Sequence, residues 1–97
     1  MDLAAFRASL DGAAPPQGLS TPLQALWWLA KGEWDKAHVL TQNDDGADAA
    51  WVHAHLHRVE GDLGNARYWY DRAGRPPASN DLPAEWSTIA RILLATG

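Results

Sequence analysis

Two short segments of this chain follow the same pattern 29 residues apart, and this repeat limits the possible folds more than any other feature. Gly32–Ala37 and Gly61–Ala66 each read glycine, acid, large apolar residue, two intervening residues and alanine. Glycine reaches the left-handed backbone angles that end a helix, and an acid side chain caps the helix that follows. Alanine then lets the two helices approach closely. We expect two helical hairpins, each with its large apolar residue filling the hairpin mouth.

The apolar residues outside these segments recur at spacings of three and four, which is typical of amphipathic helices. The first hairpin is predicted over about residues 21–42, the second over about 46–73, and a C-terminal helix over about 82–96. We expect Thr21 to cap the second helix ahead of Pro22, and Val52, Leu56 and Val59 to form the apolar stripe of the fourth. No segment alternates with period two. The sequence therefore predicts an all-α single domain over residues 1–97, with five to six short helices and the two antiparallel hairpins stacked in a right-handed, repeat-like array between flanking helices.

The hairpin pattern resembles the tetratricopeptide repeat. Gly61, Leu63, Ala66, Tyr70 and Ala73 stand where that family has glycine, a large residue, alanine, an aromatic residue and a second alanine. The spacing of 29 residues is shorter than the 34 of the family. The family's first-helix tryptophan and its leucine-glycine pair are also absent. The resemblance implies a stacked helical scaffold that binds a protein or peptide.

The segment from His55 to Tyr70 also resembles a family of short uncharacterised bacterial proteins, to which no activity is attached. This second resemblance implies a small, intact bacterial domain.

Composition excludes several classes of function. The chain has no cysteine, so disulfides, thiolate metal sites and catalytic thiols are ruled out. A net charge of −4 argues against binding to nucleic acid or to an anionic membrane surface. Asp2 and Arg7 interrupt the apolar residues at the start, where a secretory signal would need an unbroken run. We expect a cytoplasmic protein with no membrane span and no nucleic-acid partner.

Four histidines, three of them in the run His53–His57, are the strongest candidates for chemistry. Residues two apart on a helix point about 200° apart, so His55 cannot share a face with the other two. His53, His57 and Glu60 do share a face, to which His38 would add a fourth ligand if the hairpins pack suitably. Imidazole and carboxylate suit zinc or nickel. The alternative is that these histidines only form hydrogen bonds at the rim of a packed interface.

The opposite flank of the same helix carries Trp51, His55 and Arg58, which would line the concave surface of a repeat array. Stacking and charge-assisted hydrogen bonds would let these three side chains hold an acidic or aromatic ligand, or a peptide. The alternative is that this flank packs on the last helix.

Six tryptophans in 97 residues exceed what one small core is expected to hide. Trp28 and Tyr68 follow or precede inward-facing aromatic residues, so we expect both at an exposed aromatic interface. A two-fold homodimer is the simplest cover, and a well-docked first helix is the alternative. No spacing typical of catalytic residues is present. The leading prediction is a non-catalytic, repeat-like interaction module without a cofactor, and the alternative is a zinc- or nickel-binding protein or small metal-dependent enzyme.

Overall fold

The computed structural model describes residues 1–96, and this part of the chain contains six α-helices and no strand. The helices are α1 (Leu3–Ala8), α2 (Thr21–Ala30), α3 (Trp34–Gln42), α4 (Ala47–Glu60), α5 (Leu63–Ala73) and α6 (Leu82–Thr96), with a short 3-10 turn, η1 (Ser9–Asp11), after α1. The prediction of an all-α fold is confirmed for these residues.

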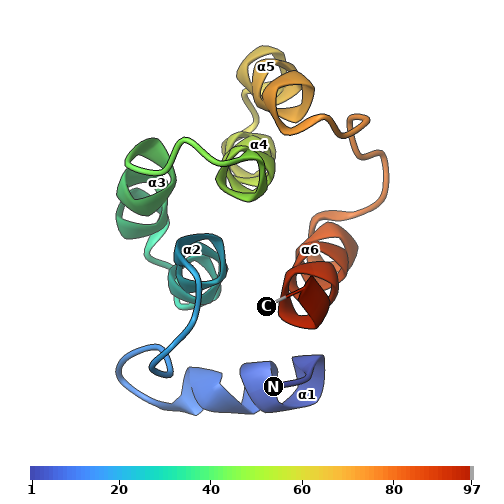
Figure 1. The fold of residues 1–97 in the computed structure, drawn as a ribbon. Helices are drawn as coiled ribbons and strands as arrows, with labels where there is room; N and C mark the ends of the chain where they lie inside the picture. The colour runs from blue at the N-terminus through green and yellow to red at the C-terminus, as the bar shows by residue number, and fades with distance from the viewer. Residues whose placement is uncertain (97) are drawn as a thin grey trace.

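Helix α4 is the centre of the molecule, because α2, α3, α5 and α6 all contact it (Figure 1). Helices α2 and α3 form the first antiparallel hairpin, and α4 and α5 form the second. The contact between α3 and α4 joins the two hairpins, which agrees with the predicted stacking. Every residue from Ala49 to His57 is buried, so α4 has almost no solvent-facing side before its last turn.

The second hairpin turns by the mechanism that its sequence predicts. Gly61 has a φ of 87°, which an L side chain rarely adopts, and the Asp62 amide donates to the His57 carbonyl at 2.9 Å. The Asp62 carboxylate then accepts a hydrogen bond from the Asn65 amide at 3.2 Å. This cap begins α5 directly after α4 ends, and so fixes the register of the hairpin.

Two details of the hairpins differ from expectation. Glu33 makes no capping bond from its side chain. Leu63 is 62 % exposed, so it does not fill the mouth of the second hairpin. Trp34, at the matching position of the first hairpin, is half-buried and donates Nε1–H to the Leu56 carbonyl at 2.9 Å. An indole reaches the neighbouring helix from this position, whereas the shorter leucine side chain remains in solvent.

Two predictions about helix residues were also wrong. Ser20, not Thr21, is the N-cap of α2, because Ser20 keeps extended backbone angles while Thr21 is already helical. Val59 is 39 % exposed instead of lying in the core with Val52 and Leu56, because the last turn of α4 borders an open groove.

The N-terminal helix is docked on the rest of the domain. The Phe6 ring is fully buried and lies 5.6 Å from the Trp86 ring of α6, and the Trp27 indole N–H donates to Ser9 Oγ at 3.1 Å. The Lys31 ammonium donates to the Leu10 carbonyl at 2.7 Å. Together these contacts make α1 the cover of one end of the helical array.

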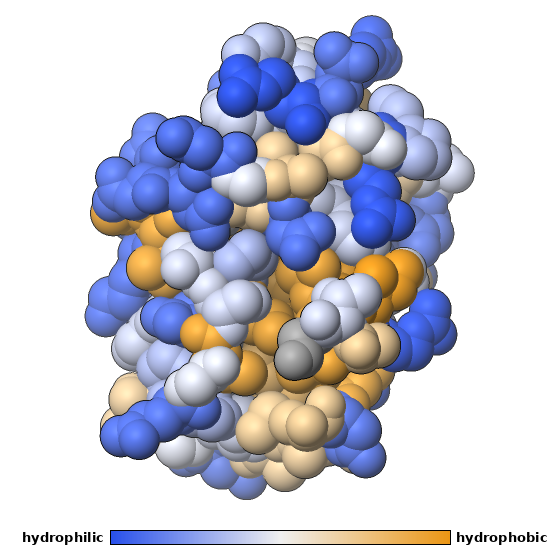
Figure 2. Space-filling view, viewed as in Figure 1, coloured by the Kyte–Doolittle hydropathy of each residue, from blue (hydrophilic) through white to orange (hydrophobic). Residues whose placement is uncertain are grey.

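The surface has an uneven distribution of apolar side chains. Figure 2 shows hydrophilic residues over α5 and apolar residues between the start of α2 and the end of α6. Leu19, Leu23 and Leu94 line a hollow in that region. Within residues 1–96, no helix is both long enough and apolar enough to span a membrane.

Candidate metal centre

Helix α4 separates its histidines as the helical period requires. His53 and His57 lie one turn apart, and their rings stack with centroids 4.9 Å apart and planes at 24°. His55 lies on another side of the helix, where it contacts α6. The three histidines of the run therefore do not form one group.

The third member of the cluster comes from the other hairpin. His38 of α3 places its Nε2 atom 3.0 Å from Nε2 of His53, and its ring lies 5.4 Å from that of His57. One nitrogen of each of the three histidines lies within 4.8 Å of one nitrogen of each of the others. The structure thus brings His38, His53 and His57 together across the junction between the hairpins.

Two tryptophans enclose the cluster. The Trp69 ring of α5 stacks on His53 with centroids 3.9 Å apart and planes at 12°. The Trp34 ring stacks on His38 at 4.7 Å. Because indole rings exclude water from these faces, the imidazoles are costly to protonate.

The surroundings of His53 and His38 lower the pKa of both side chains. Burial, and then repulsion from His38 and His57, lowers the pKa of His53 to about 4. Burial and repulsion from His57 also lower the pKa of His38, although Glu60 and Asp35 act in the opposite direction. At pH 7 His53 therefore carries a lone pair and no charge, which is the form that binds a metal.

One buried nitrogen of the cluster has no partner. His53 is 2 % exposed, and its Nδ1 atom makes no hydrogen bond within residues 1–96. Its Nε2 atom shares one proton with Nε2 of His38, since two N–H groups facing each other at 3.0 Å would repel. Most buried polar atoms in proteins are hydrogen-bonded, so Nδ1 of His53 is an exception, and it is Nε2 of this ring that faces His38.

Glu60 orients His57 and is not a member of the three-histidine group. The Glu60 carboxylate lies 2.5 Å from Nδ1 of His57 and accepts its proton. This leaves Nε2 of His57 as the free nitrogen. A carboxylate that holds the second nitrogen of a histidine is the usual support of a metal ligand. Glu60 was predicted as a ligand, and the geometry gives it this supporting position. Glu60 and Asp62 also form a second, more exposed group with His57.

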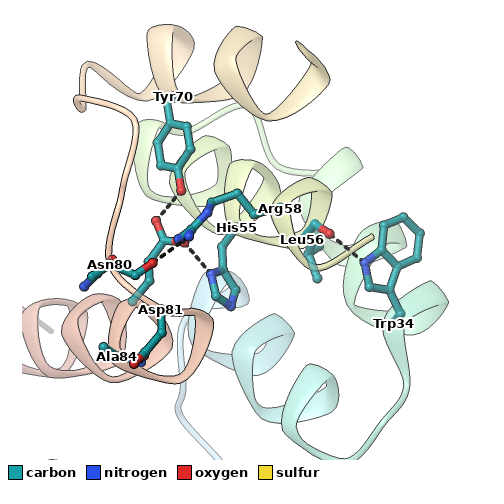
Figure 3. A network of polar contacts seen from close by, with 9 residues as sticks. Trp34, His55, Leu56, Arg58, Tyr70, Asn80, Asp81 and Ala84 are labelled. Atoms are coloured by element: carbon teal, nitrogen blue, oxygen red, sulfur yellow. Dashed lines mark hydrogen bonds and ion pairs between the residues drawn. The ribbon is translucent and has the colours of Figure 1, made fainter. Parts of the chain in front are cut away.

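The residues expected to form a ligand clamp lie under α6. Trp51 and His55 are 6 % and 2 % exposed, and the Arg58 side chain is 14 % exposed. His55 Nδ1 lies 2.6 Å and Arg58 2.8 Å from the same oxygen of Glu85, and the Tyr70 hydroxyl donates to the other oxygen (Figure 3). The three side chains thus do not line one open groove.

Glu85 is the important residue that the sequence did not reveal. Burial alone would raise the pKa of its carboxyl, but hydrogen bonds from His55, Tyr70 and Arg58 outweigh burial and lower it. Tyr70 responds in the opposite direction: burial, and then its hydrogen bond to the Glu85 carboxylate, raises the pKa of the phenol. Glu85 lies in the first turn of its helix, where an acid is ordinary, so no sequence signal marks it.

The two predicted interface aromatics differ in exposure. Tyr68 is 52 % exposed and accepts a hydrogen bond from Arg72 at 3.2 Å. Trp28 is only half-buried by its own chain, and the Lys36 ammonium lies 3.9 Å from its ring centroid. None of the six tryptophans is exposed within residues 1–96.

Fold and cluster together define a helical-hairpin protein with a three-histidine group at the hairpin junction. Comparison with protein-family models, with curated proteins and with solved structures finds no match to this chain. Membership of the tetratricopeptide family stays a prediction.

Proposed function

We propose that this protein binds a zinc-like divalent transition-metal ion through His38, His53 and His57. The observation that carries the proposal is the convergence of three histidines from two hairpins, each with one nitrogen within 4.8 Å of one nitrogen of the others. Glu60 supports the arrangement by holding His57 in one tautomer.

The spacing of the nitrogens agrees with a tetrahedral ion. Zinc–nitrogen bonds of about 2.0–2.1 Å place two ligand nitrogens about 3.3 Å apart at the tetrahedral angle. The two Nε2 atoms of His38 and His53 lie 3.0 Å apart, so the ion requires a separation only a few tenths of an ångström larger. Three imidazoles leave one coordination position for water or another ligand.

Metal analysis of protein purified without a histidine tag tests the proposal directly. We expect one equivalent of zinc, which a chelator removes. His53→Ala and His38→Ala should each lose that equivalent, and Glu60→Gln should bind about 10- to 100-fold more weakly. His55→Gln is the matched control, because His55 lies on the same helix but contacts Glu85. Equal zinc affinity in parent and His53→Ala contradicts the proposal.

Fluorescence gives an independent measurement. Trp34 and Trp69 stack directly on two of the proposed ligands, so bound Cu²⁺ or Ni²⁺ should quench part of the tryptophan emission. Mg²⁺ and Ca²⁺ prefer oxygen ligands and should leave the emission unchanged. Saturable quenching that persists in His53→Ala would place the ion elsewhere.

Binding of a protein or peptide stays a prediction, as do the cytoplasmic location and the bacterial origin. The side chains expected to contact such a partner, Trp51, His55 and Arg58, are engaged within the domain. Metal binding at the histidine cluster is therefore the better-supported proposal.

A further inference from the structure

A second site lies on the other side of α4 from the histidine cluster. Helices α1, α2, α4 and α6 surround an open groove of about 530 Å³, which is within the usual range for small-molecule sites. Its walls are mostly apolar and include Leu10, Leu29, Val59, Leu82 and the Trp86 ring. The exposure of Val59, which the sequence placed in the core, is explained by its position on this wall.

One nitrogen of a buried histidine is available to the groove. His55 lines the groove and is 2 % exposed. Its Nδ1 proton is donated to Glu85 at 2.6 Å, and Figure 3 shows its second nitrogen pointing away from that contact. Nε2 makes no hydrogen bond within residues 1–96 and keeps a small contact with solvent. An imidazole held through Nδ1 in this way presents Nε2 as a hydrogen-bonding atom for a hydroxyl group.

The position of His55 is rigidly supported. The Glu85 oxygen that accepts from His55 also accepts from Arg58 at 2.8 Å, and Tyr70 donates to the other oxygen. The imidazole plane is therefore fixed from behind, as polar groups that confer specificity on an apolar site generally are.

The rim of the groove is positively charged. Arg7 lines it and hydrogen-bonds only to Ser87 Oγ, and no ion pair of Arg7 occurs within residues 1–96. None of the groove residues is acidic, although the protein as a whole has a net charge of −4. A guanidinium without an ion pair at the mouth of an apolar groove suits a carboxylate.

We propose that this groove binds a small aromatic carboxylic acid that also carries a hydroxyl group. The ring of the ligand lies between the apolar walls beside Trp86, its hydroxyl forms a hydrogen bond with Nε2 of His55, and its carboxylate pairs with Arg7. The inference is independent of metal binding, because His53 and His57 lie on another side of the helix and His38 is not part of the groove.

Calorimetric titration with three related compounds tests the proposal in buffer that contains a chelator. The probe is 3-(4-hydroxyphenyl)propionate; 3-phenylpropionate lacks its hydroxyl, and 4-ethylphenol lacks its carboxylate. We expect the probe to bind about tenfold more tightly than either, since each loses one hydrogen-bonding or charged contact. Equal affinity for all three, or no binding at 10 mM, overturns the proposal.

Substitutions assign each contact to its residue. In His55→Phe the probe should bind no more tightly than 3-phenylpropionate, but still more tightly than 4-ethylphenol. In Arg7→Gln the probe should bind no more tightly than 4-ethylphenol, but still more tightly than 3-phenylpropionate. Arg91→Gln removes an exposed charge on α6 outside the groove and should change nothing. If His55→Phe leaves the hydroxyl advantage intact, the proposed contact is wrong.

A blocking variant covers the case in which His55→Phe does not fold. Ala30 is exposed and lines the groove, so Ala30→Trp fills the site from the solvent side without entering the core. We expect it to fold normally and to lose affinity for the probe at least tenfold. Unchanged affinity in Ala30→Trp would show that the probe binds at another site. If the parent is a dimer in solution and Ala30→Trp is a monomer, a second copy of the chain occupies the groove. Either result overturns the proposal.

Discussion

Replacing Glu85 by glutamine removes one buried negative charge and keeps the shape of the side chain. Glu85 is 3 % exposed, and its carboxylate accepts hydrogen bonds from His55, Arg58 and Tyr70. In Glu85→Gln the amide oxygen still accepts from His55 and Arg58, and the amide nitrogen donates to the Tyr70 hydroxyl. The loss is therefore mainly the charge assistance of these bonds.

The expected decrease in the free energy of unfolding is about 2–3 kcal/mol, the order of one or two charge-assisted hydrogen bonds. Glu85→Leu should cost more, about 3–5 kcal/mol, because it leaves His55, Arg58 and Tyr70 without an acceptor. Either loss is a large part of the roughly 5–15 kcal/mol that stabilises a small domain.

Urea unfolding followed by circular dichroism and by tryptophan fluorescence measures both variants. The exposed Glu33, which makes no capping bond, gives the control variant Glu33→Gln, with an expected change below about 0.5 kcal/mol. The double variant with His55→Gln should show a coupling energy of about 1–3 kcal/mol. If the free energy of unfolding of Glu85→Gln lies within about 0.5 kcal/mol of the parent value, the charge of the carboxylate does not contribute to holding α6.

Three further predictions concern the cluster, the turns and the oligomeric state. With chelator present, the free energy of unfolding should fall by about 3 kcal/mol as the pH is lowered from 6.5 to 4. In this range His53 binds a proton in the unfolded chain but stays neutral in the folded protein, where its pKa is about 4. Denaturation at several pH values measures this, and His53→Phe should flatten the profile. Gly61→Ala should destabilise the protein by about 1–2 kcal/mol, because Gly61 has a φ of 87°. Gly64 lies inside α5 with open space around it, so Gly64→Ala should stabilise the protein by about 0.5–1 kcal/mol. Equal shifts of the melting temperature in the two variants would contradict this. The homodimer stays a prediction, which a light-scattering mass of 10.6 kDa would reject.

Local signals were sufficient for the helices. Gly32, Gly61 and Gly74 all have positive φ and follow the ends of α2, α4 and α5, where the sequence placed those ends. The segment before α6 contains Pro76 and Pro77, which cannot continue a helix, and it separates α5 from α6. These features depend on residues a few positions apart, so one sequence contains all the information needed to predict them.

Contacts between distant residues were harder to predict. The sequence left open whether His38 would reach the histidines of the second hairpin, because the crossing of α3 over α4 depends on packing. Glu85 lies 30 residues from His55, its partner in space. The tryptophan count suggested a surplus of aromatic surface, but no tryptophan within residues 1–96 is exposed: two are buried and four are half-buried.

The histidine run shows why the helical period matters more than the motif. On a strand, His53, His55 and His57 would lie on one face and form one site. On α4 the period of 3.6 sends His53 and His57 toward His38, and His55 toward Glu85. The partners then give the two groups different chemistry. In the first group, burial and neighbouring imidazoles keep His53 neutral, and three converging nitrogens favour a metal ion. In the second, a carboxylate fixes His55 so that its other nitrogen faces an apolar groove. One helix of 14 residues thus separates a candidate metal centre from a candidate ligand site by the direction of alternate side chains alone.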